Sequence, residues 1–321
     1  MTRLKTIFFG TPALSVPYLE LVNRLTDLQA AVTQADKPRG RGMEVSACPV
    51  KARAEELGIK TYSPDKLKDI FEDIQNTPFD LGVAVAFGKI FRPDFLALPK
   101  LGIINVHFSL LPLLRGAAPV QRALMEGFTK TGVSVFWIRP GLDDGPLLLQ
   151  KETVISPQDN AATLFEKLVP LGLEALKEAV ALLEAGKVIQ MPQTGEPTLA
   201  PMLEKEESFL CPAELTAEEL HNRARGLACG PKPKIPFTAG GKTEWVQIIR
   251  TETAPREIAG ANCAGGTVLA VERGKGILVK CKEGALWLRE VQPAGKKAMP
   301  AEAFANGRAI KINGQVFINH G

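Results

Sequence analysis

The chain of 321 residues has a net charge of +4, is 45% hydrophobic and contains five cysteines. This length predicts two domains, and no apolar run approaches the roughly 20 residues of a bilayer span, which argues against a membrane protein. The cysteines are scattered and odd in number, without a C-x-x-C pair. They argue against a disulfide framework and favour a reducing, cytoplasmic location.

The first elements predict a βαβ unit with a parallel sheet. Residues 5–9 and 28–33 are strand-like, and residues 16–25 have helical character between them. The apolar start is too short for a signal peptide. The turn at Gly10-Thr11-Pro12 is not G-x-G-x-x-G, and no acidic residue closes the second strand. Both features argue against a nicotinamide dehydrogenase.

A long basic segment follows at residues 34–49, where compact α/β folds usually have loops of about 2–6 residues. It carries Lys37, Arg39 and Arg41 on a backbone rich in Pro and Gly. Loops of this kind can become ordered on phosphates or on an RNA end. The alternative is a disordered insertion whose charge is incidental.

The central feature is the strand end at residues 102–107. The apolar run leads into Asn105 and His107, which are two residues apart and therefore share one face of a strand. Pro112 and Gly116 then impose a loop. Polar side chains at the carboxyl end of a strand are typical of active sites in open α/β sheets. The almost wholly apolar run 81–87 predicts a neighbouring strand buried on both faces.

The sequence after the central strand predicts a change of architecture after residue 186. Strands are expected at 132–138 and 147–154, separated by a glycine-flanked turn that carries Asp143, and a helix at 161–184. Residues 187–204 are rich in Pro, Gly and Thr and predict a linker. Thr216 and Glu219 then predict a capped helix. Short strand-like pieces follow at residues 244–249, 266–271, 276–280, 285–291 and 315–318.

We therefore predict an α/β protein in three parts: a Rossmann-like domain with a mostly parallel sheet (1–186), the linker (187–204) and an OB-like β-barrel domain (205–321). From residue 205 on, Lys and Arg outnumber Glu, and there is no Asp. This excess suggests a polyanionic partner. A merely solvated basic surface is the alternative.

The chemistry centres on His107, one of three histidines in the chain. A histidine among apolar residues is often only a packed side chain, but Asn105 and Asp143 favour a catalytic role. Ser109 lacks the G-x-S-x-G context of a nucleophile, and the absence of H-E-x-x-H argues against a catalytic metal. The mechanism left is direct acyl transfer between two bound substrates, without a covalent enzyme intermediate or a metal. A protonated His107 and the Asn105 amide would stabilise the oxyanion, while Asp143 would orient His107, raise its pKa and help move a proton.

These residues resemble the folate-dependent formyltransferases in three motifs: Asn105-x-His107-x-Ser109-Leu110-Leu111-Pro112, then Arg115-Gly116-Ala117-Ala118-Pro119, and Leu142-Asp143-x-Gly145-Pro146. The 34–49 segment, with Gly40-Arg41-Gly42, and the stretch from Gly284 to Lys297 narrow the likeness to the family of methionyl-tRNA formyltransferases. The chain departs from that family at two places: Ser208-Phe209-Leu210 stands where the family usually has aspartate and tryptophan, and residues 226–231 replace an aromatic Pro-Trp-Pro-Gly element.

The resemblance implies formyl transfer from 10-formyltetrahydrofolate, a co-substrate, to the amino group of methionyl initiator tRNA in translation initiation. It implies Asn105, His107 and Asp143 as catalytic residues and Lys37, Arg39 and Arg41 as tRNA contacts. It implies no metal, no membrane and no obligatory protein partner. The implied folate-binding residues are Phe87, Gly88, Ile90, Ser109, Leu110, Leu111 and Pro112.

Two other readings stay open. The same core could act on an amino-sugar nucleotide or on water, although the basic loop and the basic barrel argue against a small acceptor. A non-enzymatic RNA-binding protein with an inert α/β body is the second, and the intact trio argues against it.

Overall fold

The computed structural model describes residues 3–39, 44–188, 190–255 and 263–318. The chain divides into two compact units. Unit 1 comprises Met1–Pro119, Lys130–Val154 and Glu166–Pro201. Unit 2 comprises Val120–Thr129, Ile155–Phe165 and Met202–Gly321. No helix in the described ranges is both long enough and apolar enough to cross a membrane.

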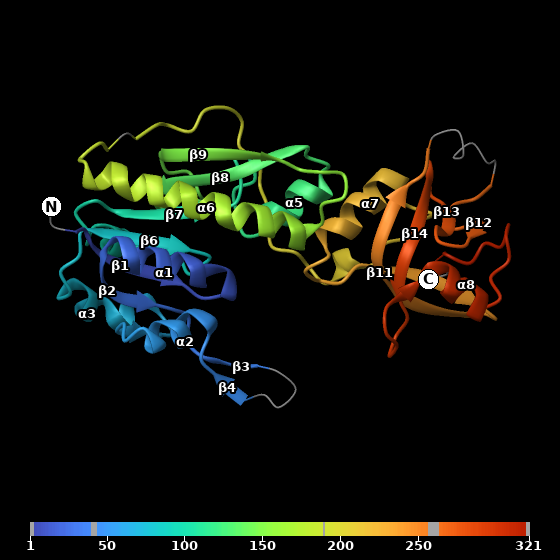
Figure 1. Cartoon of the computed structure of the whole chain (residues 1–321), viewed down its shortest axis with the longest axis horizontal. Coiled ribbons are helices and arrows are strands. Elements are labelled where there is room, and N and C mark those ends of the chain that lie inside the picture. Colours follow the sequence, from blue (N-terminus) through green and yellow to red (C-terminus); the bar gives the residue numbers. More distant parts are fainter. Residues whose placement is uncertain (1–2, 40–43, 189, 256–262, 319–321) are drawn as a thin grey trace. The chain divides into compact units, whose positions relative to one another are not determined.

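Unit 1 contains a mixed sheet with strand order β5-β2-β1-β6-β7-β8-β9 (Figure 1). The pairings from β5 to β7 are parallel, while β8 and β9 are added antiparallel. The predicted mostly parallel, Rossmann-like sheet is therefore confirmed. The strands are β1 Lys5–Gly10, β2 Asp27–Val32, β5 Thr61–Tyr62, β6 Leu81–Val85, β7 Ile103–His107, β8 Lys130–Trp137 and β9 Leu147–Val154.

Helices pack against the sheet of unit 1. Helix α1 is tied to α6 because the Tyr18 hydroxyl donates to the Val169 carbonyl at 3.0 Å. Phe9 of β1 packs edge-on against Phe91 and Phe95, with ring centroids 5.1 and 5.9 Å away. The helices of this unit are α1 Val16–Leu25, α2 Pro49–Glu56, α3 Phe71–Gln75, α4 Pro93–Leu96 and α6 Ala161–Glu184, whose residues 161–165 belong to unit 2, with 3-10 turns at Ala13–Ser15 and Leu67–Ile70. Helix α5 (Pro119–Met125) belongs to unit 2 apart from Pro119.

The basic segment expected to lack regular structure contains two short strands. Strands β3 (Lys37–Arg39) and β4 (Glu44–Ser46) pair antiparallel to form a hairpin. At its base, Lys51 of α2 and Asp36 form an ion pair at 2.5 Å. Because these residues flank the two strands, the ion pair closes the base of the hairpin.

Unit 2 is built on an antiparallel sheet with strand order β10-β11-β14-β13-β12, and β15 pairs with β14. Residues 313–317 hydrogen-bond to both edges of this sheet: Asn313 N donates to Val268 O at 2.8 Å, and Thr238 N donates to Val316 O at 2.7 Å. The sheet therefore curls toward closure, as a barrel requires. The strands are β10 Lys234–Ala239, β11 Lys242–Thr253, β12 Val268–Glu272, β13 Gly276–Lys280, β14 Ala285–Gln292 and β15 Met299–Pro300.

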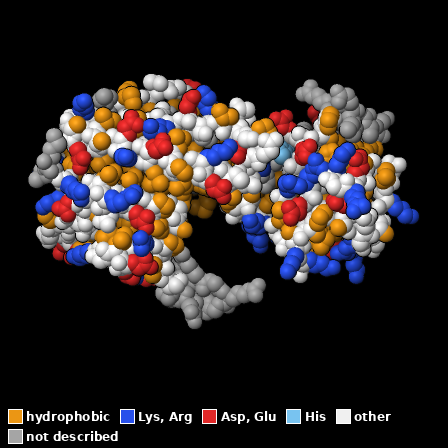
Figure 2. Space-filling view, viewed as in Figure 1, with side chains coloured by type: hydrophobic (Ala, Val, Ile, Leu, Met, Phe, Trp, Pro, Cys, Tyr) orange, Lys and Arg blue, Asp and Glu red, His pale blue; other side chains and the backbone are white. Residues whose placement is uncertain are grey.

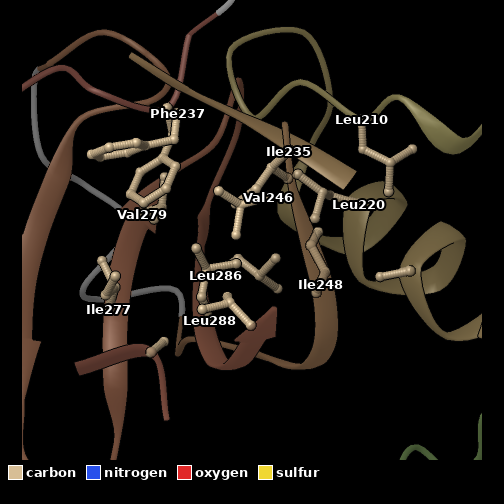
Figure 3. Packing of buried hydrophobic residues seen from close by; sticks show 14 of the residues in the cluster. Leu210, Leu220, Ile235, Phe237, Val246, Ile248, Ile277, Val279, Leu286 and Leu288 are labelled. Atoms are coloured by element: carbon tan, nitrogen blue, oxygen red, sulfur yellow. The ribbon is translucent and has the colours of Figure 1, made fainter. Parts of the chain in front are cut away.

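The inner face of this sheet carries the core of unit 2. Figure 3 shows side chains of β10, β11, β13 and β14 pointing toward one another, among them Ile235, Val246 and Leu286. Phe304 of helix α8 (Ala301–Gly307) packs edge-on against Phe237 with ring centroids 5.1 Å apart. Helix α7 (Ala217–Gly226) contributes Leu220 to the same core, and a 3-10 turn at Glu206–Ser208 precedes it.

Two sequence predictions for unit 2 need correction. Residues 315–318 form no strand. Their β-pairing is limited to an isolated bridge between Gln315 and Thr267. Strand β10, which contains Pro236, was not among the strands expected from the sequence. Pro236 is tolerated because β10 lies at one end of the strand order, next to β11, and edge strands accept proline.

The predicted helix cap is confirmed at the start of α7. The Thr216 hydroxyl accepts from Glu219 N at 3.2 Å, and the Glu219 carboxylate accepts from Thr216 N at 2.9 Å. Thr216→Ala is expected to lower the free energy of unfolding by about 1 kcal/mol because it removes one partner of a reciprocal cap. Urea unfolding measures this loss, and Thr216→Ser, which keeps the hydroxyl, should retain the stability. Equal losses in both variants would contradict the capping role.

Candidate active site

Two neighbouring parallel strands deliver the predicted site residues to one edge of the sheet. Strand β6 ends at Val85, and β7, its parallel neighbour, ends at His107. The 87–90 loop and the 109–112 turn therefore both follow strands that end at the same sheet edge. Asn105 and His107 lie two residues apart on β7 and share one face.

His107 is 6% exposed, is hydrogen-bonded at one ring nitrogen and has the Asp143 carboxylate near the other. Its Nε2 lies 2.9 Å from the carbonyl oxygen of Leu114, and its Nδ1 lies 3.7 Å from Asp143 Oδ2. A carbonyl oxygen only accepts, so Nε2–H donates to Leu114. In the neutral ring, Nδ1 then carries a lone pair that faces the side of the carboxylate.

Asp143 reaches His107 from the loop between β8 and β9. Its backbone has a positive φ of 45°, and its Oδ2 accepts from Gly116 N at 2.8 Å. Gly116 is required there for two reasons: its φ is 125°, and a Cβ atom would lie 2.7 Å from the carbonyl oxygen of Ala200. The Arg115-Gly116-Ala117-Ala118-Pro119 motif thus supplies a backbone donor that fixes the carboxylate.

Burial lowers the pKa of His107 below its ordinary value of 6.5. The Asp143 carboxylate and the hydrogen bond to Leu114 raise this pKa, but by less than burial lowers it. Asp143 therefore shifts this pKa in the direction expected from the sequence, but burial outweighs it. In the substrate-free chain the neutral imidazole is favoured at pH 7, and His107 is poised to accept a proton.

The pKa of His107 can be measured by NMR titration, because the chain contains three histidines. We expect a value below 6.5 in the unaltered chain. In Asp143→Asn it should fall further, because the carboxylate that favours the charged ring is removed. The His107 signals are identified by their loss in His107→Ala. An unchanged or higher pKa in Asp143→Asn would show that the carboxylate does not act on His107.

The Asn105 side chain is half-buried, and its amide has no hydrogen-bond partner within the described part of the chain. Its donors are therefore available to a bound molecule on the face of β7 that also carries His107.

The turn after β7 is fixed by its own hydrogen bonds. Ser109 Oγ donates to Leu113 O at 2.6 Å, and Ser134 Oγ donates to Ser109 O at 2.7 Å. Leu111 is 3% exposed, and its carbonyl accepts from Gln150 Nε2 at 2.9 Å. Ser109 and Leu111 therefore act within the protein, whereas Leu110 and Pro112 are half-exposed.

The loop after β6 shows a similar division of roles. The Phe87 ring is 4% exposed and packs 5.5 Å from the rings of both Phe9 and Phe91. Gly88 has a φ of +72°, and Ile90 is 89% exposed. Of the side chains implied for folate binding in this loop, Ile90 is accessible, whereas Phe87 is part of the core.

The basic residues of the 34–49 segment are placed only in part. Lys37 and Arg39 are the first and last residues of β3. Arg41 lies outside the described residues. Within the described ranges, no group of three or more His, Cys, Asp or Glu side chains is placed to hold a metal ion.

Several residues that hold the site were not expected from the sequence. The Leu114 carbonyl binds His107, Ser134 and Gln150 fix the 109–112 turn, and Gln193 donates to backbone carbonyls of the Asp143 loop. Their partners lie up to 50 residues away in the chain. No local pattern signals such contacts.

Comparison with known proteins gives concordant matches. A formyl transferase family model matches residues 18–180, and a model of the formyl transferase C-terminal domain matches residues 202–309. The methionyl-tRNA formyltransferase of Elusimicrobium minutum is 44% identical over 332 residues, covering 98% of this chain and all of the relative. That of Myxococcus xanthus is 39% identical and covers 99% of each chain.

A solved structure supports the fold. The N-formyltransferase from Helicobacter canadensis, in complex with folinic acid and dTDP-3-aminofucose, superposes with a TM-score of 0.66. It is 16% identical in sequence, and the match covers 90% of this chain and 99% of the other. The match in fold agrees with the family models and with the close relatives over the full length. The chain therefore belongs to the formyl transferase family, in the group of the methionyl-tRNA formyltransferases.

Proposed function

We propose that this protein transfers the formyl group of 10-formyltetrahydrofolate to the α-amino group of methionyl initiator tRNA, in the cytoplasm, for translation initiation. The observation that carries the proposal is the buried His107 within 3.7 Å of Asp143, with the Asn105 amide, which has no partner among the described residues, on the same strand face. In this proposal residues 1–186 are the catalytic domain, 187–204 the linker and 205–321 the tRNA-binding domain.

The three side chains have distinct roles in the proposed reaction. The Asn105 amide donates to the formyl oxygen as negative charge develops on it during attack by the amine. His107 accepts the proton that the amine loses, because the neutral ring donates from Nε2 to Leu114 and so offers the lone pair of Nδ1. Asp143 stabilises the imidazolium that forms. The proton then passes to the folate nitrogen as the bond between that nitrogen and the formyl carbon breaks.

The two loops beside β6 and β7 are suited to hold the folate co-substrate. Leu110, Pro112 and Ile90 offer accessible apolar surface for a flat ring. Gly88, Ser109, Leu111 and Phe87 give these loops their shape. The Asn105 amide is a suitable donor for the carbonyl oxygen that the folate would carry.

The proposed tRNA contacts are the basic hairpin segment and unit 2. Figure 2 shows Lys and Arg side chains spread over the visible face of unit 2, with fewer Asp and Glu side chains between them. A basic surface attracts the phosphate backbone. Lys37, Arg39 and Arg41 would add contacts from the 34–49 segment.

Arg41→Ala is expected to raise the KM for initiator tRNA about tenfold, because one charge-assisted hydrogen bond contributes about 1.5 kcal/mol. The KM for the folate should stay unchanged, and the salt dependence of tRNA binding should weaken by about one phosphate contact. Steady-state kinetics at several salt concentrations measure all three quantities. Equal damage to both KM values would place Arg41 in the folate site or in the fold.

The proposed function is tested by following radiolabelled formyl groups with different acceptors. Methionyl initiator tRNA, a dTDP-linked amino sugar and water are compared at equal enzyme and folate concentrations. We expect the label on the tRNA. Label found only in free formate, or only on the sugar, would replace this proposal by a hydrolase or a sugar formyltransferase.

A further inference from the structure

One segment of unit 1 supports both partners of His107. Residues 193–200 run along the loop that follows β7: the Thr198 hydroxyl accepts from Leu114 N at 2.8 Å, and Thr198 O accepts from Arg115 N at 2.8 Å. The Leu114 carbonyl in turn accepts from His107. This segment lies in the stretch whose sequence predicts only a linker.

Gln193 connects that loop to the loop of Asp143. Its Nε2 donates to Asp143 O at 2.7 Å and to Gly145 O at 2.8 Å. Its Oε1 accepts from Arg115 Nη2 at 2.7 Å and from Arg115 Nε at 3.2 Å. A guanidinium only donates and backbone carbonyls only accept, so these partners fix the orientation of the amide. Gln193 uses both of its N–H donors and receives two hydrogen bonds.

We propose that Gln193 is a positioning residue that holds the Asp143 carboxylate at its working distance from His107. It does not touch the reacting atoms. It fixes the backbone of Asp143, which has a positive φ of 45°, a conformation that most residues adopt only when the surroundings impose it. Gly116 N fixes the carboxylate of the same residue, so Asp143 is held at its backbone and at its side chain.

Loss of the Gln193 hydrogen bonds is therefore expected to lower the rate of formyl transfer rather than the affinity for either substrate. Misplacing a catalytic group by about 1 Å can lower a rate roughly 100-fold. The inference rests on the proposed formyl transfer for its rate measurement. The NMR titration of His107 supplies a second readout that does not depend on the identity of the substrate.

Two substitutions separate the interactions of Gln193. Gln193→Met keeps the size of the side chain and removes every hydrogen bond. Gln193→Glu keeps an acceptor for Arg115 but places an oxygen against the Asp143 and Gly145 carbonyls. The same two substitutions at Gln190 are matched controls, since Gln190 is exposed and makes no side-chain hydrogen bond among the described residues.

Both Gln193 variants are expected to lose roughly 10- to 100-fold in kcat, with both KM values nearly unchanged. In Gln193→Met the pKa of His107 should shift downward, as in Asp143→Asn, because the carboxylate that raises it is displaced. The Gln190 variants should match the unaltered protein. A merely structural role would lower the unfolding temperature without moving the His107 pKa.

A wild-type kcat in either Gln193 variant, or an unchanged His107 pKa in Gln193→Met, would overturn the positioning role. If the unaltered protein formylates no tRNA, the proposed function fails. The His107 titration then still decides whether Gln193 positions Asp143.

Discussion

His107→Ala is expected to lower kcat by roughly 10² to 10⁴-fold, the range of a positioned general acid or base. In the unaltered chain burial keeps the ring neutral and ready to take the proton of the attacking amine, and Asp143 favours the charged form once the proton arrives. Alanine removes the proton acceptor, and the Asp143 carboxylate loses the ring nitrogen that lies 3.7 Å away in the unaltered protein. Rapid-quench kinetics with saturating substrates measure the loss.

Binding of initiator tRNA provides the control for His107→Ala, because the proposed tRNA contacts lie elsewhere. The dissociation constant should stay close to that of the unaltered protein. Normal tRNA binding together with a wild-type formylation rate would show that His107 is only a packed core residue. Since His107 is 6% exposed, the unfolding temperature of the variant should be recorded as well.

Asn105→Ala is expected to lower kcat by roughly 10² to 10³-fold, the usual effect of removing one donor to a developing oxyanion. The amide has no partner within the described chain, so its loss breaks no hydrogen bond of the substrate-free protein. The stability should therefore change little. A strong rate effect with a small stability effect distinguishes a substrate-facing donor from a structural side chain.

Asn105→Asp sharpens this test. It keeps the shape of the side chain and replaces the donor by a carboxylate that repels the oxyanion. Its kcat should be at least as low as that of Asn105→Ala. If Asn105→Asp is more active than Asn105→Ala, the side chain acts through its acceptor oxygen, which contradicts the assigned role.

Features that depend on local patterns could be predicted from the sequence. The strand–helix–strand pattern of residues 5–33 predicted the parallel sheet, and the spacing of two residues placed Asn105 and His107 on one face of β7. The Thr216 cap depends on a spacing of three residues and is present in the structure. The association of Asp143 with His107 was inferred from the chemistry that these polar side chains could perform, and the two side chains are 3.7 Å apart.

Features that depend on distant contacts or on competing energies could not be predicted. Gln193 sits in a Pro- and Gly-rich stretch, and nothing near it in the chain indicates its four hydrogen bonds to Arg115, Asp143 and Gly145. The direction of the His107 pKa depends on how burial compares with the nearby carboxylate. That comparison requires the depth of the ring in the fold, which no sequence pattern gives.

The central claim is that Asn105, His107 and Asp143 act together on one formyl carbon. A single-turnover measurement with labelled 10-formyltetrahydrofolate and methionyl initiator tRNA tests it most directly, using the unaltered protein, His107→Ala, Asn105→Ala and the double variant. We predict that label reaches the methionine amino group in the unaltered protein, and that the double variant is less impaired than the product of the two single effects, as expected for residues acting as a unit. Transfer at the wild-type rate in the double variant, or label released only as formate, would contradict the account.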